Sequence, residues 1–366
     1  MNQLQRHRFE VLDGFRGIAA LMVAIFHLNV NGYLSHLYLI KNSWLFVDFF
    51  FVLSGFIIGY GYLDKIYNFS DLRVFILKRI ARIYPLHLFM LLLFIPFGLV
   101  NLIVGVNLGE RFSFSSFIQN IFLIQALGFN NQETWNVPAW SISVEFYAYI
   151  LFSLISLYFP FYKNKILFLS FLSFLSFFIL YYFSTMSDTV EFSFFRCTFS
   201  FFLGVVAFLI FKKFNYNLKP WIELLIFALV IFYLSSDFIY SSSYKAFLSP
   251  LLFFVVILVF SKEKGLISTI LKCNLFQFLG KLSFSIYLTH SFFVTIIKSI
   301  VLIIEKNSES VYLYEINQQK VLDFGWGGIN DLIFLPYLVV IIIFSFFTYK
   351  YIEIYFQKKI ISKLIK

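Results

Sequence analysis

The stretch LDGFRGIAALMVAIFHL, residues 12–28, is apolar enough to begin a membrane-spanning helix, yet it contains Arg16 and His27. On a helix their separation amounts to about three turns, so both side chains share one face within roughly 20° and stand about 16 Å apart along the axis. Keeping a charged and a titratable side chain inside a membrane is costly. We therefore expect the helix face that carries Arg16 and His27 to line a functional site.

The composition extends this interpretation to the whole chain. Of its 366 residues, 60% are hydrophobic, only 13% are charged and 55 are Phe, and the mean hydropathy is +0.84. A soluble domain carries about 25% charged residues. The apolar residues fall in long runs, whereas an outer-membrane barrel has short alternating segments. The predicted fold is all-α: a polytopic membrane protein with about ten transmembrane helices.

The apolar runs give ten predicted spans and no internal repeat. They cover residues 12–31, 45–63, 86–107, 142–159, 165–183, 195–211, 220–238, 246–261, 283–304 and 332–349. Residues 117–129 are apolar but too short to cross, which favours an interfacial or re-entrant segment. Residues 305–331 form a polar outer loop with a turn at Gly325–Gly328. We expect residues 1–366 to form a single membrane domain without an extra soluble domain.

The basic residues predict the orientation in the membrane. Twenty-one of the 29 Lys and Arg residues fall at the termini or in even-numbered loops, and six, including Arg196, are assigned to the other loops. Cytoplasmic loops carry such an excess, so both termini are expected in the cytoplasm. The same bias accounts for the net charge of +10, so no nucleic-acid partner is expected. The two isolated cysteines predict neither a disulfide nor a metal site.

Two further arginines are predicted to join Arg16 at the cytoplasmic mouth. Arg79 and Arg82 lie just before the third span, and their spacing of three residues puts them on one helix face. Pro85 is expected to break or kink that helix where it enters the membrane. Three converging guanidinium groups suit the phosphate groups of a ligand. The alternative is that these arginines are only positive-inside anchors.

The outer half of the membrane is predicted to hold an imidazole and two carboxylates at similar depth. These are His27, Asp48 near the outer end of the second span, and Glu145 near the outer end of the fourth. A base with an orienting acid has this composition. The sequence gives depth but not rotation about the helix axis, so their convergence is a hypothesis. A hydrogen-bonded core histidine and capping carboxylates are the structural alternatives. Further candidates, for substrate binding, are Trp140, Ser143, Tyr287 and His290.

Five segments together resemble a known family. They are LDGFRGIAALMVAIFH (12–27), VDFFFVLSGFIIGY (47–60), LKRIARIYPLHL (77–88), TWNVPAWSISVEFY (134–147) and LGKLSFSIYLTHS (279–291). Their content and order over almost the whole chain resemble the acyltransferase-3 family of integral membrane acyltransferases. The closing segment TYKYIEIYFQKK (348–359) lacks the proline expected after Glu353, and the carboxylate pair often seen after WS-x-S-V is reduced to Glu145.

The resemblance implies a stand-alone enzyme similar to polysaccharide O-acetyltransferases. Such an enzyme moves an acyl group, usually acetyl, from cytosolic acyl-coenzyme A to a hydroxyl of a sugar in O-antigen, exopolysaccharide, peptidoglycan or another glycolipid. It is expected in the bacterial inner membrane and needs no metal. Arg16, Arg79 and Arg82 would hold the donor phosphates. His27 would act as base or accept the acyl group transiently, and Asp48 or Glu145 would set its tautomer.

Two other functions compete with this hypothesis. A polar pathway through ten spans suits a transporter of acyl groups or glycolipid that acts with a separate enzyme, although the sequence lacks an inverted repeat of Gly- or Pro-broken segments. A membrane scaffold within a polysaccharide assembly complex is the third option. A scaffold gains nothing obvious from Arg16 and His27 inside a span.

Overall fold

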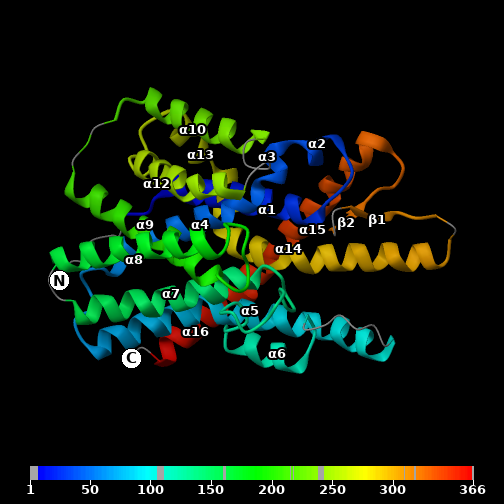
Figure 1. Cartoon of the computed structure of the whole chain (residues 1–366), viewed down its shortest axis with the longest axis horizontal. Coiled ribbons are helices and arrows are strands. Elements are labelled where there is room, and N and C mark those ends of the chain that lie inside the picture. The colour runs from blue at the N-terminus through cyan, green and yellow to red at the C-terminus, as the bar shows by residue number, and fades with distance from the viewer. Residues whose placement is uncertain are drawn as a thin grey trace.

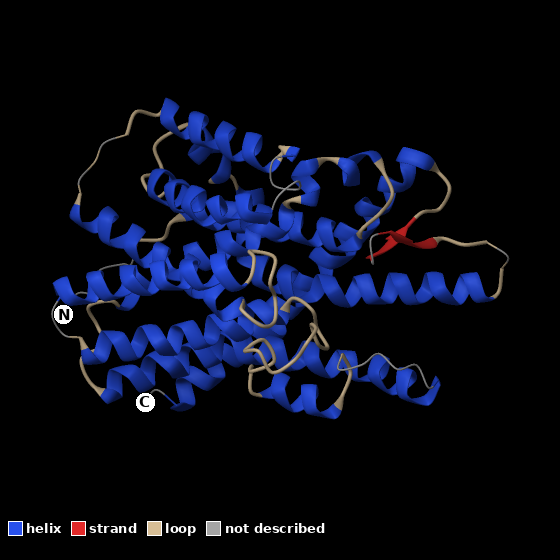
Figure 2. Cartoon of the chain, in the orientation of Figure 1, coloured by secondary structure: helices blue, strands red, loops and turns tan. Residues whose placement is uncertain are grey.

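The computed structural model describes residues 7–104, 111–159, 162–214, 216, 218–237, 243–308, 310–316 and 319–364. Most of these residues are helical (Figures 1 and 2), which confirms the all-α fold. The longer helices are α1 (Glu10–Leu28), α4 (Phe46–Tyr62), α5 (Phe69–Val104), α7 (Ala139–Tyr158), α8 (Tyr162–Phe183), α9 (Ser193–Lys213), α10 (Trp221–Leu234), α12 (Leu248–Phe260), α14 (Asn274–Lys306) and α15 (Phe334–Thr348).

Shorter elements connect them. These are α2 (Tyr33–His36), α3 (Tyr38–Lys41), η1 (Ser43–Leu45), α6 (Phe114–Ile121), η2 (Ser243–Phe247), α13 (Leu266–Leu271), β1 (Leu313–Ile316), β2 (Gln319–Leu322), η3 (Gly327–Ile333), η4 (Tyr349–Ile354) and α16 (Tyr355–Leu364). The element η4 is a π-helical turn that joins α15 to α16.

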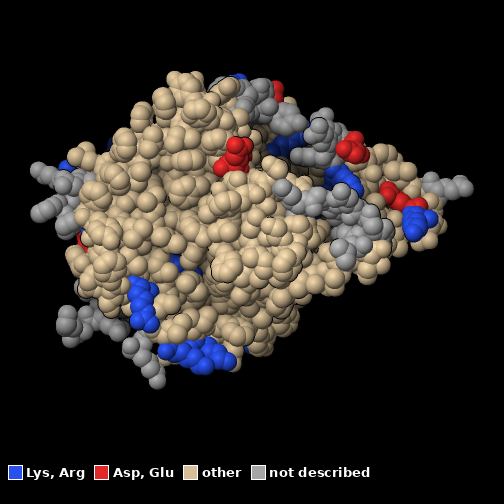
Figure 3. Space-filling view, turned by 60° about the horizontal axis from the view of Figure 1, so that its bottom comes forward, with Lys and Arg blue, Asp and Glu red and all other residues tan. Residues whose placement is uncertain are grey.

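Eight helices among the described residues are long and apolar enough to cross a membrane. They coincide with eight of the ten predicted spans. At the other two predicted spans the apolar helices are shorter, Trp221–Leu234 and Tyr244–Phe260. Much of the surface in Figure 3 carries no charged residue, as a surface that faces lipid chains requires. The chain is therefore a multi-pass membrane protein.

The third long helix begins earlier than predicted and includes the arginine pair. Helix α5 starts at Phe69 and runs without interruption through Pro85, so Arg79 and Arg82 lie inside it rather than ahead of the span. Proline is tolerated within membrane helices, where neighbouring helices satisfy the freed carbonyl groups. The helix is therefore not broken at Pro85, whereas the alternative of a kink there stays a prediction. Residues 114–121 form only the short helix α6, in agreement with a segment that does not cross.

Two pairs of glycines bring helix backbones into close contact. Gly55 of α4 lies against the backbone of Phe201 on α9, and Gly204 of α9 lies against the backbone of Val52 on α4. Gly17 of α1 and Gly280 of α14 face each other's helices in the same way. Small residues permit this approach, and van der Waals packing then holds the helices together where no hydrophobic driving force exists in lipid. The second pair fixes the register between α1 and α14.

A small cap, predicted to lie on the outer side of the membrane, covers the C-terminal end of α1. Strands β1 and β2 pair antiparallel, and Leu322 also bridges to Val30 just after α1. Asp323 accepts hydrogen bonds from Asn31 at 2.7 Å, from Asn330 at 2.8 Å and from the backbone of Gly325 at 2.9 Å. The hydrogen bond from Asn31 and those from the other two donors hold the pKa of Asp323 below its usual value. The turn predicted at Gly325–Gly328 is confirmed, with positive φ at Gly325 and Gly327.

The described chain starts and finishes at the same end of the bundle (Figure 1), as an even number of spans requires. Arg6 and Lys366, which entered the charge count, lie outside the described residues, as do the ends of the predicted spans at 105–107 and at 238. Arg196 was assigned to an outer loop, but it belongs to the first turn of α9 and is buried.

Candidate active site

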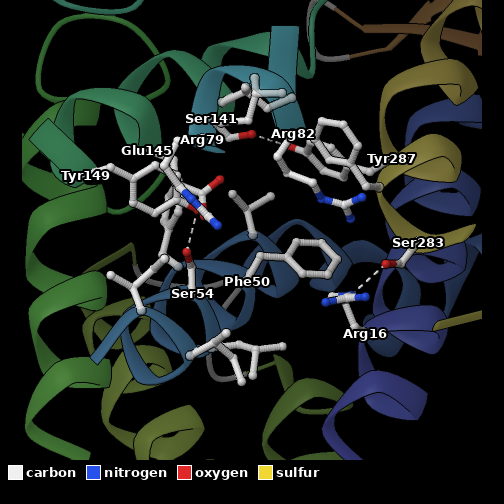
Figure 4. Close-up of a pocket in the computed structure, with 18 residues that line it drawn as sticks. Arg16, Phe50, Ser54, Arg79, Arg82, Ser141, Glu145, Tyr149, Ser283 and Tyr287 are labelled. Atoms are coloured by element: carbon white, nitrogen blue, oxygen red, sulfur yellow. Dashed lines mark hydrogen bonds between the residues drawn. The ribbon is translucent and has the colours of Figure 1, made fainter. Parts of the chain in front are cut away.

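A cavity of about 180 Å³ lies between α1, α4, α5, α7 and α14 (Figure 4). Arg16, Arg79 and Arg82 all line it. The remaining lining residues are Val47, Phe50, Phe51, Leu53, Ser54, Ile57, Ile58, Ile83, Ser141, Ile142, Glu145, Tyr149, Ser283, Phe284 and Tyr287. The predicted convergence of the three arginines on one space is thus present in the structure. We call this space the arginine cavity.

Arg16 is held by helix α14. Its Nε donates to Ser283 Oγ at 2.7 Å, and its Nη2 donates to the carbonyl of Gly280 at 2.9 Å. Nη2 also lies 3.2 Å from the carboxylate of Asp13, one turn earlier on α1. The close approach of the helices at Gly280 brings that carbonyl within reach. Arg16 is therefore fixed at the edge of the cavity rather than extended into solvent.

Arg82 pairs with a residue whose role the sequence left open. Glu353, in the π-helical turn η4, is fully buried, forms an ion pair with Arg82 and accepts a hydrogen bond from Ser285 at 3.0 Å. A π-helical turn often occurs at a functional site. Here it belongs to the segment that delivers a carboxylate to the interior of the bundle. The charge of Arg82 is thereby balanced while the side chain still lines the cavity.

Arg79 has unused hydrogen-bonding capacity. Its guanidinium lies over the rings of Tyr62, Phe75 and Tyr149, with 5.6 to 5.8 Å between the guanidinium carbon and the ring centroids. Its Nε is buried and has no hydrogen-bond partner among the described residues. Buried donors are nearly always paired. An unpaired donor at the wall of a cavity therefore indicates a place where a ligand accepts the missing hydrogen bond.

Glu145 lines the arginine cavity instead of approaching His27. Tyr149 donates to its carboxylate at 2.6 Å, and Ser54 lies 2.7 Å from the same Tyr149 hydroxyl. Figure 4 shows Glu145, Tyr149 and Arg79 on one side of the cavity, with Arg82 and Arg16 on the other. The depth predicted for Glu145 did not determine its rotation about α7. The structure does not bring Glu145 into contact with His27.

Asp48 also points elsewhere. Its carboxylate accepts two hydrogen bonds from Arg196, at 3.0 and 2.8 Å, and both side chains are almost completely buried. The guanidinium of Arg196 lies between the rings of Trp44 and Trp140. The expected contact of Asp48 with His27 is absent, because the partner of Asp48 is a cation on α9. This pair joins α4 to α9.

The four predicted substrate-binding residues divide into two groups. Tyr287 lines the arginine cavity, and its hydroxyl lies 2.8 Å from Ser141 Oγ. His290 is fully buried behind Tyr287, with 5.8 Å between the ring centroids. Trp140 packs against Arg196, and Ser143 donates to the carbonyl of Leu123. Neither Trp140 nor Ser143 lines the cavity.

His27 lies beyond the arginine cavity, beside His290. The centroids of the two rings are 4.9 Å apart. The Nδ1 of His27 is 2.8 Å from the carbonyl of Val23, and a carbonyl only accepts, so Nδ1 carries the proton and Nε2 has a free lone pair. The tautomer that we expected a carboxylate to select is therefore set by the backbone of α1 itself.

A second cavity, of about 310 Å³, adjoins the first and shares Arg16 and Arg79 with it. It is also lined by Arg8, by Asp13 and by Tyr60 near the end of α4. The two spaces run from the start of α1 to Tyr287. Basic side chains thus line the route into the bundle from the end where the described chain begins.

Comparison with known proteins shows to which family the chain belongs. The sequence profile of a family described as "Acyltransferase domain" matches residues 9–350, almost the entire chain. The protein belongs to this acyltransferase family. Protein 2 of the picA locus of Rhizobium radiobacter is 36% identical over 107 residues, which are 29% of this chain and 54% of that protein.

Two other relatives have names that state an activity. The O-acetyltransferase OatA of Staphylococcus aureus is 28% identical over 152 residues, 39% of this chain and 24% of that protein. The acyltransferase MdmB of Streptomyces mycarofaciens is 29% identical over 164 residues, 40% of this chain and 39% of that protein. The matches therefore cover about half or less of each relative. No solved structure matches.

Membership of this family favours an enzyme over a transporter or a scaffold. One contact at the arginine cavity escaped the sequence interpretation. Tyr149 follows Glu145 by four residues, a spacing that places both on one helix face and could have suggested their contact. The position of Glu353 beyond the tenth predicted span suggests a pairing with basic residues on the inner side, but the sequence does not identify Arg82 as the partner.

Proposed function

We propose that the protein transfers an acetyl group from cytosolic acetyl-coenzyme A to a sugar hydroxyl of a cell-surface polysaccharide or glycolipid. The observation that carries this proposal is the grouping of Arg16, Arg79 and Arg82 around one cavity. Guanidinium groups bind phosphate oxygens in pairs of parallel hydrogen bonds. Coenzyme A carries several phosphates, whereas its acetyl end is small and uncharged.

The residues present fit such a donor. The unpaired Nε of Arg79 supplies a free buried donor, and Arg8 adds a further positive charge at the second cavity. With the phosphates at the arginines, the pantetheine arm would have to extend toward His27. Arg16 and His27 stand about 16 Å apart along α1, a span that suits an extended arm of this kind.

In this mechanism His27 removes the proton from the acceptor hydroxyl with its Nε2 lone pair. The hydroxyl oxygen attacks the thioester carbonyl, the carbon–sulfur bond breaks, and the proton passes to the leaving sulfur. An alternative, in which His27 first takes the acetyl group, uses the same lone pair. Glu145, which accepts a hydrogen bond from Tyr149, balances the charge of Arg79 and Arg82 rather than orienting the base.

The position of His27 supports the acceptor side of the proposal. His27 lies at the end of α1 opposite to Arg16, close to the outer cap, where a sugar at the membrane surface would approach. The relative OatA is named an O-acetyltransferase, which supports acetyl as the group and oxygen as its acceptor. We propose the bacterial inner membrane as the location, with both termini in the cytoplasm.

Binding of acetyl-coenzyme A to the purified protein in nanodiscs tests the donor site. Changing Arg16, Arg79 or Arg82 to Gln removes a charge-assisted contact, so each change should raise the dissociation constant by about 10-fold or more. Arg73 lies on α5 but is exposed, so Arg73→Gln is the matched control and should bind normally. Equal affinity in all four variants would remove the cavity from donor binding.

The chemical step is tested in cells by mass spectrometry of the surface glycans. His27→Ala and Arg16→Ala should both abolish the acetyl mass increment, while the protein still accumulates in the membrane. Comparison of cells with and without the gene identifies the glycan that loses the acetyl unit. Near-normal acetylation with His27→Ala would exclude His27 from the mechanism.

A further inference from the structure

His290 has a buried nitrogen that nothing in the described chain satisfies. Its ring is fully buried, and its Nδ1 lies 3.3 Å from the carbonyl of Ile286. A carbonyl only accepts, so Nδ1 carries the proton and Nε2 has a lone pair. That Nε2 has no hydrogen-bond partner among the described residues. Since buried polar atoms are nearly always paired, His290 calls for a donor that is not yet present.

The register of two helices places His27 beside His290. Helices α1 and α14 run in the same direction and touch at Gly17 and Gly280. Ten residues further along each helix stand His27 and His290, whose ring centroids are 4.9 Å apart. Both histidines bond through Nδ1 to the carbonyl four residues earlier in their own helix. Two imidazoles with the same tautomer therefore lie side by side.

Protonation of His27 would supply the hydrogen-bond donor that His290 Nε2 lacks. While both rings are neutral, neither Nε2 has a hydrogen to offer the other. When His27 takes a proton at Nε2, it becomes a donor beside the lone pair of His290. Resting on the function proposed above, we propose that His290 is the positioning partner of His27, accepting a hydrogen bond from its imidazolium during acyl transfer. The backbone of α1 sets the tautomer of His27, and His290 stabilises the charged form.

The step balances without any further reactant. The acceptor hydroxyl gives its proton to His27 as the new carbon–oxygen bond forms. His290 holds the resulting N–H of His27 by a hydrogen bond and gains no proton itself. As the carbon–sulfur bond breaks, His27 returns the proton to the thiolate, and both rings regain their starting tautomers.

Neighbouring groups hold His290 in place, and the nearby charged groups already have other hydrogen-bond partners. On the cavity side its ring contacts Tyr287, which is fixed by Ser141. The charged groups in electrostatic range of His27 are Glu133 and Lys298. Glu133 accepts a hydrogen bond from Thr189 at 2.7 Å, and Lys298 donates to the carbonyl of Lys320 at 3.0 Å. Both are engaged elsewhere, whereas His290 Nε2 is not.

The test compares His290→Leu with His290→Gln, because the side-chain oxygen of Gln can accept a hydrogen bond and Leu cannot. Membranes that contain each full-length variant receive radiolabelled acetyl-coenzyme A, and the initial rate of label incorporation into glycan is measured. For His290→Leu we expect kcat to fall about 10- to 100-fold, with the KM for acetyl-coenzyme A changed less than about threefold. His290→Gln should recover a substantial part of kcat.

Two controls make the outcomes decisive. Thr289→Val changes the adjacent buried polar residue, which bonds to Ser345 on α15, and it should leave kcat near normal. The melting temperature of each purified variant reports on folding. An unchanged kcat in His290→Leu, or an equal loss in Leu and Gln variants with lowered melting temperatures, would overturn the proposal for His290. Normal kcat in His27→Ala would instead overturn the proposed function beneath it.

Discussion

At position 353 a glutamate reaches the interior of the bundle through a π-helical turn. Its burial is possible because one carboxylate oxygen pairs with Arg82 and the other accepts from Ser285. A buried charge without such partners is strongly destabilising. The ion pair orients the guanidinium that lines the arginine cavity, so Glu353 influences the donor site without lining it.

Glu353→Gln should therefore weaken donor binding. The amide still bonds to Ser285 but no longer holds the charge of Arg82, and we expect the KM for acetyl-coenzyme A to rise about 10-fold. The measurement is steady-state kinetics together with the double variant Arg82→Gln/Glu353→Gln. If the two residues act as a unit, the double variant is no worse than Arg82→Gln alone. Fully additive losses would show that they act independently.

Asp48 and Arg196 form a second buried ion pair, and its role is in the stability of the fold. Both side chains are at most 1% exposed, and the guanidinium is enclosed by Trp44 and Trp140. Asp48→Asn leaves a buried cation without its counter-charge, at an expected loss of about 3–5 kcal/mol in unfolding free energy. Equilibrium unfolding in mixed micelles measures this loss.

A second variant separates the charge from the shape of the side chain. Asp48→Leu combined with Arg196→Met removes both charges, and an apolar pair of similar volume is often as stable as the ion pair that it replaces. The double variant should therefore be more stable than Asp48→Asn. A double variant that is less stable than Asp48→Asn would contradict this account.

At the scale of helices, close packing of α4 on α9 depends on Gly55 and Gly204. A side chain at Gly204 would collide with the backbone of Val52, so Gly204→Leu should lower the unfolding free energy by about 1–3 kcal/mol. The control is Gly325→Asn, because no atom lies within 4 Å of a Cβ placed there and Asn tolerates positive φ. Similar melting temperatures for both variants would rule out the glycine contact as a determinant.

The arginines and the carboxylates show what the sequence predicts at this scale. Arg79 and Arg82 share a helix face by spacing alone, and a charge inside a span faces protein rather than lipid, so their convergence with Arg16 could be expected. The rotation of a helix about its axis depends on its neighbours. The partner of Asp48 is Arg196, 148 residues away, and no local pattern connects them.

Span boundaries were less predictable for a related reason. Helix α5 continues through Pro85. Membrane helices tolerate proline where neighbouring helices satisfy the freed backbone groups, and a hydropathy pattern does not report such neighbours. The fold class and the outer turn follow from composition and glycine placement. The contact of His27 with His290 depends on the register between α1 and α14. Equal ten-residue spacings from Gly17 and from Gly280 are the signal in the sequence that could have suggested it.

At the scale of the whole molecule, the outer cap depends on an ionised carboxylate. The pKa of Asp323 is held below its unfolded value, chiefly by Asn31, so its contribution to stability is present above an unfolded pKa of about 3.9. That contribution is lost as the pH falls through the lower, folded pKa. The cap should therefore loosen only in strong acid.

Hydrogen exchange of residues 29–36 and 319–331, corrected for intrinsic rates, measures this loosening. In the natural protein we expect exchange to accelerate below about pH 4. Asp323→Asn, which lacks the charge, should exchange faster at pH 7 and show no further acid-dependent step. An identical acid step in Asp323→Asn would assign the transition to another carboxylate.

The glycine contact between α1 and α14 also limits which insertions and deletions the two helices tolerate. Adding or deleting one amino acid between residues 281 and 289 would turn His290 by about 100° relative to Gly280, away from its neighbour on α1. A single-codon insertion or deletion there, or between residues 18 and 26, is thus expected to inactivate the enzyme although hydropathy hardly changes. Among related natural sequences, insertions and deletions should therefore be more frequent in the segment between α14 and α15.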